Sequence, residues 1–113
     1  MSETHVFTLT AQQDFEAIAR FIGRDNPPKA REYFQSARTA FLALDDNFTP
    51  RRASAKLPQK IREMTVKGFK GYSLRVMRHN DGPYFLLSAH RPGRSEANKN
   101  RRTQQGLRDV YDS

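Results

Sequence analysis

Residues 84–94 read YFLLSAHRPGR, an apolar run that ends in one imidazole and two guanidinium side chains. The run is apolar on both of its alternating faces, which is typical of a strand inside a sheet. Such a strand is held rigidly, and a rigid element that presents several cations can bind a polyanion or an acidic partner. We therefore expect a functional surface at the end of this strand, with His90, Arg91 and Arg94 facing the solvent.

Two further strands are predicted before this one. Apolar and polar residues alternate over 61–66 and, more clearly, over 71–77. The second alternation places three side chains on one face: Tyr72, Leu74 and Val76. Asn80-Asp81-Gly82 predicts a tight hairpin, because these residues accept positive φ at low cost. Residues 45–60 show no clear periodicity, and we expect a loop there.

Two helices are predicted in the first half of the chain, after a short strand over 5–9. Thr10 and Gln13 form a capping box that begins the first helix, which should end near Gly23. Asn26 is followed by two prolines, a combination that begins a second helix. The apolar residues of this helix advance in steps of four and three, which predicts a stripe packed in the core: Ala30, Phe34, Ala37, Phe41 and Leu44.

These elements predict an α+β fold in the order β-α-α-β-β-β, with a helical hairpin packed on a small, mainly antiparallel sheet. At 113 residues, of which 36% are hydrophobic, the chain is long enough for one core and too short for two. We expect a single domain over 1–113. Residues 95–113 form a polar C-terminal tail that is either loose without a partner or a short helix with one apolar face: Leu107, Val110 and Tyr111.

The charge of the chain is concentrated in its second half. The formal net charge is +8, and residues 51–113 carry 15 basic and 5 acidic side chains. This distribution favours a nucleic acid, a nucleoprotein or an acidic protein as partner; the alternative is a basic surface that serves solubility. Absence of cysteine fits a reducing compartment. Without a signal-like or membrane-length apolar run, we expect a cytoplasmic protein with no membrane partner.

The chemistry-bearing residues are cationic. The sequence has no GxGxxG, Walker-type or GxSxG motif and no histidines paired with carboxylates at metal-ligand spacing, so we expect no cofactor and no metal. Guanidinium and ammonium groups can bind phosphate, and in a metal-free ribonuclease they can stabilise a phosphorane. The predicted target-binding residues lie on the strands or their edges: Lys67, Lys70, Arg75, Arg78, His90, Arg91 and Arg94.

Several short motifs together resemble the RelE/ParE toxin superfamily. They span about residues 5–95 and comprise 6–10, 14–18, 21–22, Asp25-Asn26-Pro27 with Ala30, Gly71-Tyr72 before a strand, and a closing strand that ends in His90-Arg91. The resemblance implies a toxin of a type II toxin–antitoxin pair that is neutralised by a cognate antitoxin.

The superfamily has two activities, and the residues separate them. RelE-like members cleave mRNA on the ribosome with an arginine and often a tyrosine, where this chain has Ser73 and Asn98. If the chain is such a nuclease, the candidate catalytic residues are Arg75, His90, Arg91 and Tyr111. ParE-like members poison DNA gyrase and commonly carry the Asp-Asn-Pro and His-Arg motifs. We favour the ParE-like reading, with the nuclease and a non-toxic partner-binding module as alternatives.

Overall fold

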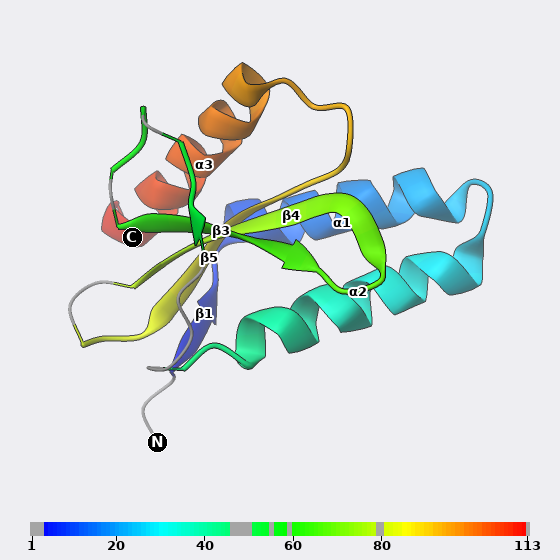
Figure 1. Cartoon of the computed structure of the whole chain (residues 1–113), viewed down its shortest axis with the longest axis horizontal. Helices are drawn as coiled ribbons and strands as arrows, with labels where there is room; N and C mark the ends of the chain where they lie inside the picture. The colour runs from blue at the N-terminus through cyan, green and yellow to red at the C-terminus, as the bar shows by residue number, and fades with distance from the viewer. Residues whose placement is uncertain (1–3, 46–50, 55, 59, 79–80, 113) are drawn as a thin grey trace.

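The computed structural model describes residues 4–45, 51–54, 56–58, 60–78 and 81–112 (Figure 1). Over this part of the chain the predicted α+β order is confirmed, with one added strand and one added helix. The elements are β1 (His5–Phe7), α1 (Leu9–Gly23), α2 (Pro27–Leu42), β2 (Arg51–Arg52), β3 (Ile61–Val66), β4 (Phe69–Arg78), β5 (Tyr84–His90) and α3 (Glu96–Tyr111). None of the described helices combines the length and apolar character of a membrane span.

The sheet has the strand order β1-β5-β4-β3-β2. β1 pairs with β5 in parallel, and the other neighbours are antiparallel, as the prediction of a mainly antiparallel sheet requires. β5 lies between β1 and β4, which confirms its predicted place inside the sheet. The loop predicted over 45–60 is wrong at Arg51–Arg52, because this pair extends the sheet along β3 as β2. Of the predicted 80–82 hairpin, Asn80 lies outside the described residues.

The two N-terminal helices begin at capping residues. Asn26 caps α2 as predicted, and its side-chain oxygen accepts a hydrogen bond from the Lys29 amide. The cap of α1 is Thr8 instead of the predicted Thr10. The Thr8 hydroxyl accepts from the Ala11 amide and donates to the Leu86 carbonyl of β5. This bond to a distant strand begins the helix two residues earlier and ends β1 at Phe7.

The main core lies between the α1–α2 hairpin and one face of the sheet. It includes the predicted Tyr72, Leu74 and Val76 face of β4. The predicted stripe of α2 needs one correction: Phe34 is 45% exposed, and Tyr33 takes its place in the core. Aromatic side chains then meet edge to face, with Phe15 and Tyr33 centroids 6.1 Å apart.

α3 covers the opposite face of the sheet (Figure 1). The polar tail is therefore a 16-residue helix, capped by Ser95, whose hydroxyl accepts from the Asn98 amide. Leu107 joins a second apolar cluster with Leu57, Ile61, Met77 and Leu87. The helix approaches β5 closely.

Gly106 is the residue that allows this approach. A Cβ atom placed at Gly106 would lie 2.1 Å from the Leu87 carbonyl oxygen, so only glycine fits without movement. Leu87 is the extra residue of a β-bulge, because Arg75 pairs with Ser88 and Val76 with Leu86. As a result, Leu87 and Ser88 both face α3.

Candidate functional site

The predicted target-binding residues divide into exposed and buried groups. Lys67 and Lys70 are exposed at the β3–β4 turn and the start of β4, and Arg91 and Arg94 are partly exposed in the segment after β5. The expectation that cations at the strand end face solvent is wrong for His90, which is 1% exposed; Arg75 is equally buried. α3 covers the sheet face on which these two residues lie, and this helix was not expected to extend so far.

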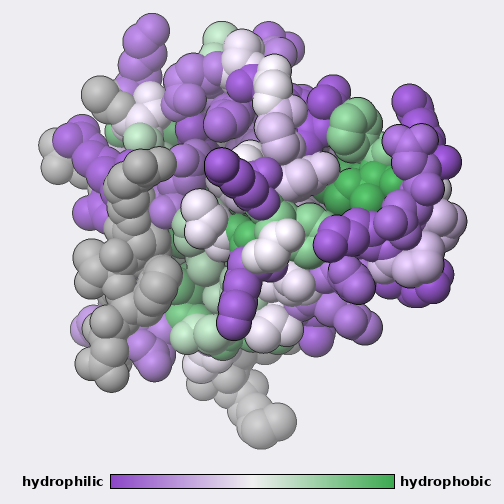
Figure 2. All heavy atoms as spheres, turned by 45° about the vertical axis from the view of Figure 1, so that its right-hand side comes forward, coloured by the Kyte–Doolittle hydropathy of each residue, from purple (hydrophilic) through white to green (hydrophobic). Residues whose placement is uncertain are grey.

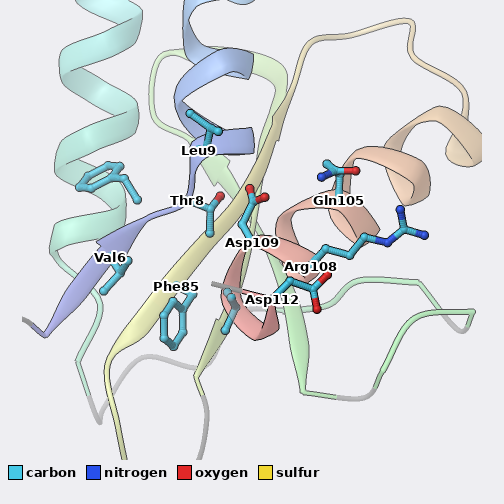
Figure 3. Close-up of a pocket in the computed structure, with 10 residues that line it drawn as sticks. Val6, Thr8, Leu9, Phe85, Gln105, Arg108, Asp109 and Asp112 are labelled. Atoms are coloured by element: carbon cyan, nitrogen blue, oxygen red, sulfur yellow. The ribbon is translucent and has the colours of Figure 1, made fainter.

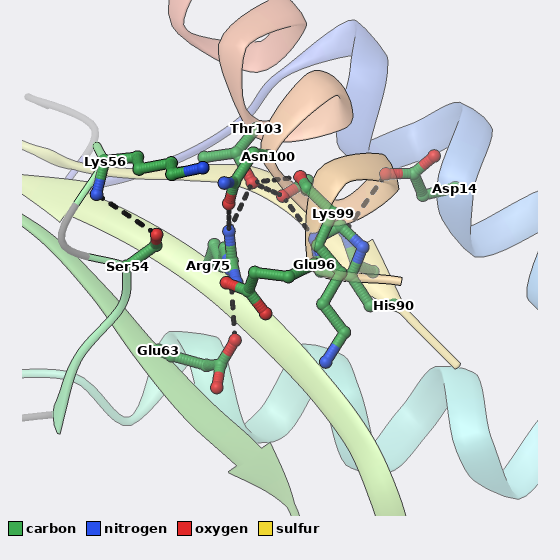
Figure 4. A network of polar contacts seen from close by, with 12 residues as sticks. Asp14, Ser54, Lys56, Glu63, Arg75, His90, Glu96, Lys99, Asn100 and Thr103 are labelled. Carbon is green, nitrogen blue, oxygen red and sulfur yellow. Dashed lines mark hydrogen bonds and ion pairs between the residues drawn. The ribbon is translucent and has the colours of Figure 1, made fainter. Parts of the chain in front are cut away.

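Arg75 is held at the centre of a polar network between the sheet and α3 (Figure 4). Its Nε donates to Glu63 on β3 at 3.0 Å, and Nη2 donates to Glu96 on α3 at 2.8 Å. Nη1 donates to the Asn100 side-chain oxygen at 2.7 Å. Since two carboxylates and an amide already bind this guanidinium, Arg75 joins β3, β4 and α3 and does not present an open phosphate-binding fork.

His90 is the end of a buried hydrogen-bond chain that reaches α3. The Thr103 hydroxyl donates to the Lys99 carbonyl at 2.7 Å. Ser88 therefore donates its hydroxyl proton to Thr103 at 2.9 Å and accepts from His90 Nε2, also at 2.9 Å. In this arrangement the Nδ1 atom carries no proton. It is buried and has no hydrogen-bond partner within the described ranges.

The electrostatic surroundings keep His90 neutral. Burial, and then the charge of Arg75, lower the pKa of His90 to about 3. A neutral imidazole without access to solvent cannot exchange protons with a substrate. In this conformation His90 therefore supports the docking of α3 and does not act as a general base.

Asp14 of α1 and Arg102 of α3 form an ion pair between the two helices that was not predicted from the sequence. Asp14 Oδ1 lies 2.8 Å from Arg102 Nη2, and Oδ2 accepts from the Ala89 amide at 3.1 Å. Burial raises the pKa of Asp14, although the Ala89 amide and Arg102 oppose this change. The sequence signal was a lone carboxylate among the apolar positions of the first helix, beside Phe15.

Arg78 and Tyr111 also have partners within the fold. Arg78 donates to the Gly82 carbonyl at 2.8 Å, and its guanidinium carbon lies 4.9 Å from the Tyr84 ring centroid, so it closes the β4–β5 hairpin. Tyr111 accepts from Lys60 at 2.8 Å and lies at the opposite end of α3 from Glu96. The structure thus places Tyr111 apart from Arg75 and His90.

Arg91, like Arg78, has an aromatic partner on another element. Its guanidinium carbon lies 4.3 Å from the centroid of the Phe21 ring on α1. Phe21 is 42% exposed, so the pair lies at the surface. This contact connects the strand end to the last turns of α1.

An apolar groove of about 470 Å³ runs between α1 and α2. Its lining includes Phe15 and the exposed Phe34, with Glu16 and Arg38 at its sides. Figure 2 shows that apolar surface on the face in view gathers in patches among hydrophilic side chains. The groove therefore offers apolar contacts with charges of both signs beside them.

A second hollow, of about 530 Å³, lies where β1 and the start of α1 meet the end of α3 (Figure 3). Thr8, Phe85 and Arg108 are among its lining residues, and none of the predicted target-binding residues lines it. The Asp109 carboxylate accepts from the Thr10 amide at 2.8 Å, which fixes α3 to the N-terminus of α1. We therefore attribute this hollow to the packing of α3 against the start of α1 and assign it no binding role.

Comparison with known proteins gives one family. The family model described as the ParE toxin of the type II toxin–antitoxin system, parDE, matches residues 6–93. A solved structure of the chromosomal ParDE TA system from P. aeruginosa is similar, with 20% identity and a TM-score of 0.66 over 80% of this chain and 96% of that chain. At this identity the likeness is one of fold. No curated protein matches in sequence. α3 lies beyond the residues that the family model matches.

Proposed function

The chain belongs to the ParE toxin family of type II toxin–antitoxin systems, and we propose that it arrests growth by poisoning DNA gyrase until a cognate antitoxin neutralises it. The observation that carries this proposal is the burial of Arg75 and His90 beneath α3. A toxin that acts by contact needs an exposed surface, whereas a nuclease needs exposed groups that reach the scissile phosphate.

The exposed cations supply the proposed contact with gyrase. Lys67, Lys70, Arg91 and Arg94 have accessible side chains and form no ion pair with the described residues. Cations that are not neutralised within the protein steer association with an acidic or DNA-bound target. Arg75, Arg78 and His90 are used within the fold, so we assign them no direct contact.

The proposed antitoxin contact is the groove between α1 and α2. Phe34 is exposed beside Phe15, and an amphipathic antitoxin segment would bury both rings as it folds on binding. Acidic residues of that segment would pair with Arg38, which is exposed at the side of the groove. The partner would be a small protein, encoded beside this chain, with a DNA-binding half and an acidic, flexible half.

Expression in cells, together with gyrase supercoiling by the purified protein, tests the proposed target. We expect filamentous, arrested cells and inhibited supercoiling. Inhibition should weaken about tenfold or more in R91A/R94A if the two arginines are hot spots of the contact, because arginine is enriched among the residues whose truncation costs about 2 kcal/mol or more. The matched control is R101A/R108A, which removes two exposed arginines of α3 and should inhibit like the parent. His90 is left intact because its removal would disturb the fold.

The ribosomal nuclease is the alternative that this experiment must separate. Ribosomes that translate a defined mRNA are incubated with the same preparations, and the message is examined for breaks. Codon-positioned cleavage with gyrase unaffected would reject the proposal and imply that α3 moves away from Arg75.

Calorimetry with the product of the neighbouring gene tests the antitoxin groove. It should show binding that weakens in Phe34→Ala. If the two proteins show no heat of binding and do not co-elute at micromolar concentration, the groove assignment is wrong.

A further inference from the structure

Four arginines surround an open hollow that neither the gyrase contact nor the antitoxin groove uses in full. Arg20 and Arg24 come from the last turns of α1 and its cap, and Arg91 and Arg94 come from the segment after β5. The hollow has a volume of about 820 Å³, and Phe21 lies among its lining residues. We call it the arginine hollow, defined by Arg20, Arg24, Arg91 and Arg94.

The arginine hollow carries positive charge that the fold does not neutralise. Its four guanidinium groups form no ion pair with any residue that the structure describes. Asp14 is the nearby carboxylate whose pKa responds to Arg94, but its two oxygens already accept from Arg102 and the Ala89 amide. The carbonyl end of α1 favours cations at Arg20, yet it does not account for the arginines of the second segment.

Phe21 gives the arginine hollow a second property. It is 42% exposed, and the Arg91 guanidinium lies 4.3 Å from its ring centroid. An exposed aromatic ring stacked with arginine is a platform on which an unpaired base can stack. The volume of the hollow exceeds what a single inorganic anion fills and is in the range of sites for larger ligands.

We propose that the arginine hollow binds single-stranded nucleic acid, with phosphates on the four guanidinium groups and a base stacked against Phe21 and Arg91. An acidic peptide would use the charges but gain little from the aromatic ring. A duplex would reach the charges while its bases stayed stacked within the helix. The combination of arginine forks with an exposed ring therefore favours an unpaired strand. This assignment does not depend on which cellular target the toxin poisons.

Fluorescence anisotropy of a labelled 12-nucleotide strand, as DNA and as RNA, tests the proposal without gyrase or ribosomes. Four phosphate contacts on a single strand predict a slope of about −3 for log affinity against log salt. We expect R20A/R24A to lower affinity about tenfold or more and to reduce the slope by about 1.4. Phe21→Leu should lower affinity by at least about fivefold with the slope unchanged, because stacking does not release counterions.

The matched control is R101A/R108A, which removes two exposed arginines of α3 and the same charge. It should bind within about twofold of the parent if the arginine hollow is the site. Melting curves establish that each variant is folded. If R20A/R24A is not, Arg94→Gln tests the other wall and should weaken binding in the same direction.

Four outcomes would overturn the assignment. The first is no binding of the labelled strand at 100 µM protein and 50 mM salt. In the second, R101A/R108A weakens binding as much as R20A/R24A, which would mean a diffuse charge effect. In the third, a hairpin duplex binds as tightly as the single strand. In the fourth, a polyglutamate peptide displaces the strand at equal charge concentration and Phe21→Leu has no effect, which would make this an acidic-peptide site.

Discussion

The two faces of the sheet are covered in different ways. The α1–α2 hairpin covers one face with aliphatic and aromatic side chains, among which Phe15, Tyr33 and Phe41 are at most 3% exposed. α3 covers the other face with a smaller apolar cluster and a polar network centred on Arg75. The first arrangement is stabilised by the area it removes from water, and the second requires particular partners for each buried polar group.

The apolar face therefore contributes mainly to the stability of the fold, and the polar face fixes the position of α3. Apolar contacts tolerate small displacements, but a buried guanidinium stabilises only the arrangement in which its hydrogen bonds are complete. The family match ends at residue 93, before α3 begins. The residues of the hairpin face therefore lie within the matched part of the chain, and α3 lies outside it.

The largest expected effect is on the hairpin face. Phe41→Ala removes a fully buried ring that contacts Phe7, and the free energy of unfolding should fall by about 3–5 kcal/mol. Urea unfolding followed by circular dichroism measures the change. Phe34→Ala on the same helix is the control, because its ring is 45% exposed, and it should cost less than about 1 kcal/mol. Equal losses of stability in both variants would contradict the placement of Phe41 in the core and of Phe34 at the surface.

The next effect is on the α3 face. Arg75→Met removes the guanidinium that pairs with Glu63 and Glu96, and we expect the free energy of unfolding to fall by about 3 kcal/mol, the low end for a broken buried pair. Double-mutant cycles then compare the two carboxylate partners. Coupling of Arg75 to Glu63, whose side chain is 16% exposed, should exceed its coupling to Glu96, which is 58% exposed and screened by solvent. The reverse order would mean that α3 holds Arg75 more strongly than β3 does.

Replacing one glycine on each face by alanine should change the free energy of unfolding by a smaller amount, with opposite signs on the two faces. Gly106→Ala places a Cβ against the Leu87 carbonyl and should cost about 1–3 kcal/mol, although alanine is the better helix former. Gly23→Ala at the end of α1 meets only the Ala30 Cβ at 3.7 Å and should raise stability by about 0.5 kcal/mol. Thermal melting of both variants decides this. A stable Gly106→Ala protein would mean that α3 can withdraw from β5.

The hairpin face could be predicted from sequence because its signals are local. The Asn26 cap, the end of α1 at Gly23 and the alternation of β4 need only neighbouring residues. Thr8 and Thr10 each carry a possible cap, and the choice between them depends on the Leu86 carbonyl, 78 residues away. No local pattern contains that bond.

The α3 face could not be predicted in the same way. α3 presents Thr103, Gly106 and Leu107 to the sheet. Its only apolar pattern is at its C-terminal end, so the sequence indicated at most a short helix and gave no sign that the earlier turns are packed. Arg75 looks like a surface cation until Glu63 and Glu96 are placed beside it. Both partners come from other elements, and this is why the buried site residues were expected in solvent.

The last expected effect is a pH dependence on the α3 face, which develops only as the pH falls below 6.5. The folded protein holds His90 with a pKa of about 3, against an ordinary value of 6.5, so between these values the unfolded chain binds the extra proton. Stability contributed by neutral His90 is complete above pH 6.5. It should fall by about 1.4 kcal/mol for each unit below that value.

Urea unfolding of the parent and His90→Gln between pH 7.5 and 5 measures this slope. The parent should lose stability as the pH falls, and the variant should lose clearly less, because glutamine carries no titrating proton. Asp14 works in the opposite direction, since its raised pKa favours the folded state in acid, but its ordinary value of 3.8 places that contribution toward the acidic end of the window. Equal slopes in the two proteins would show that His90 is protonated in the folded state, and α3 would then have to open to hydrate it.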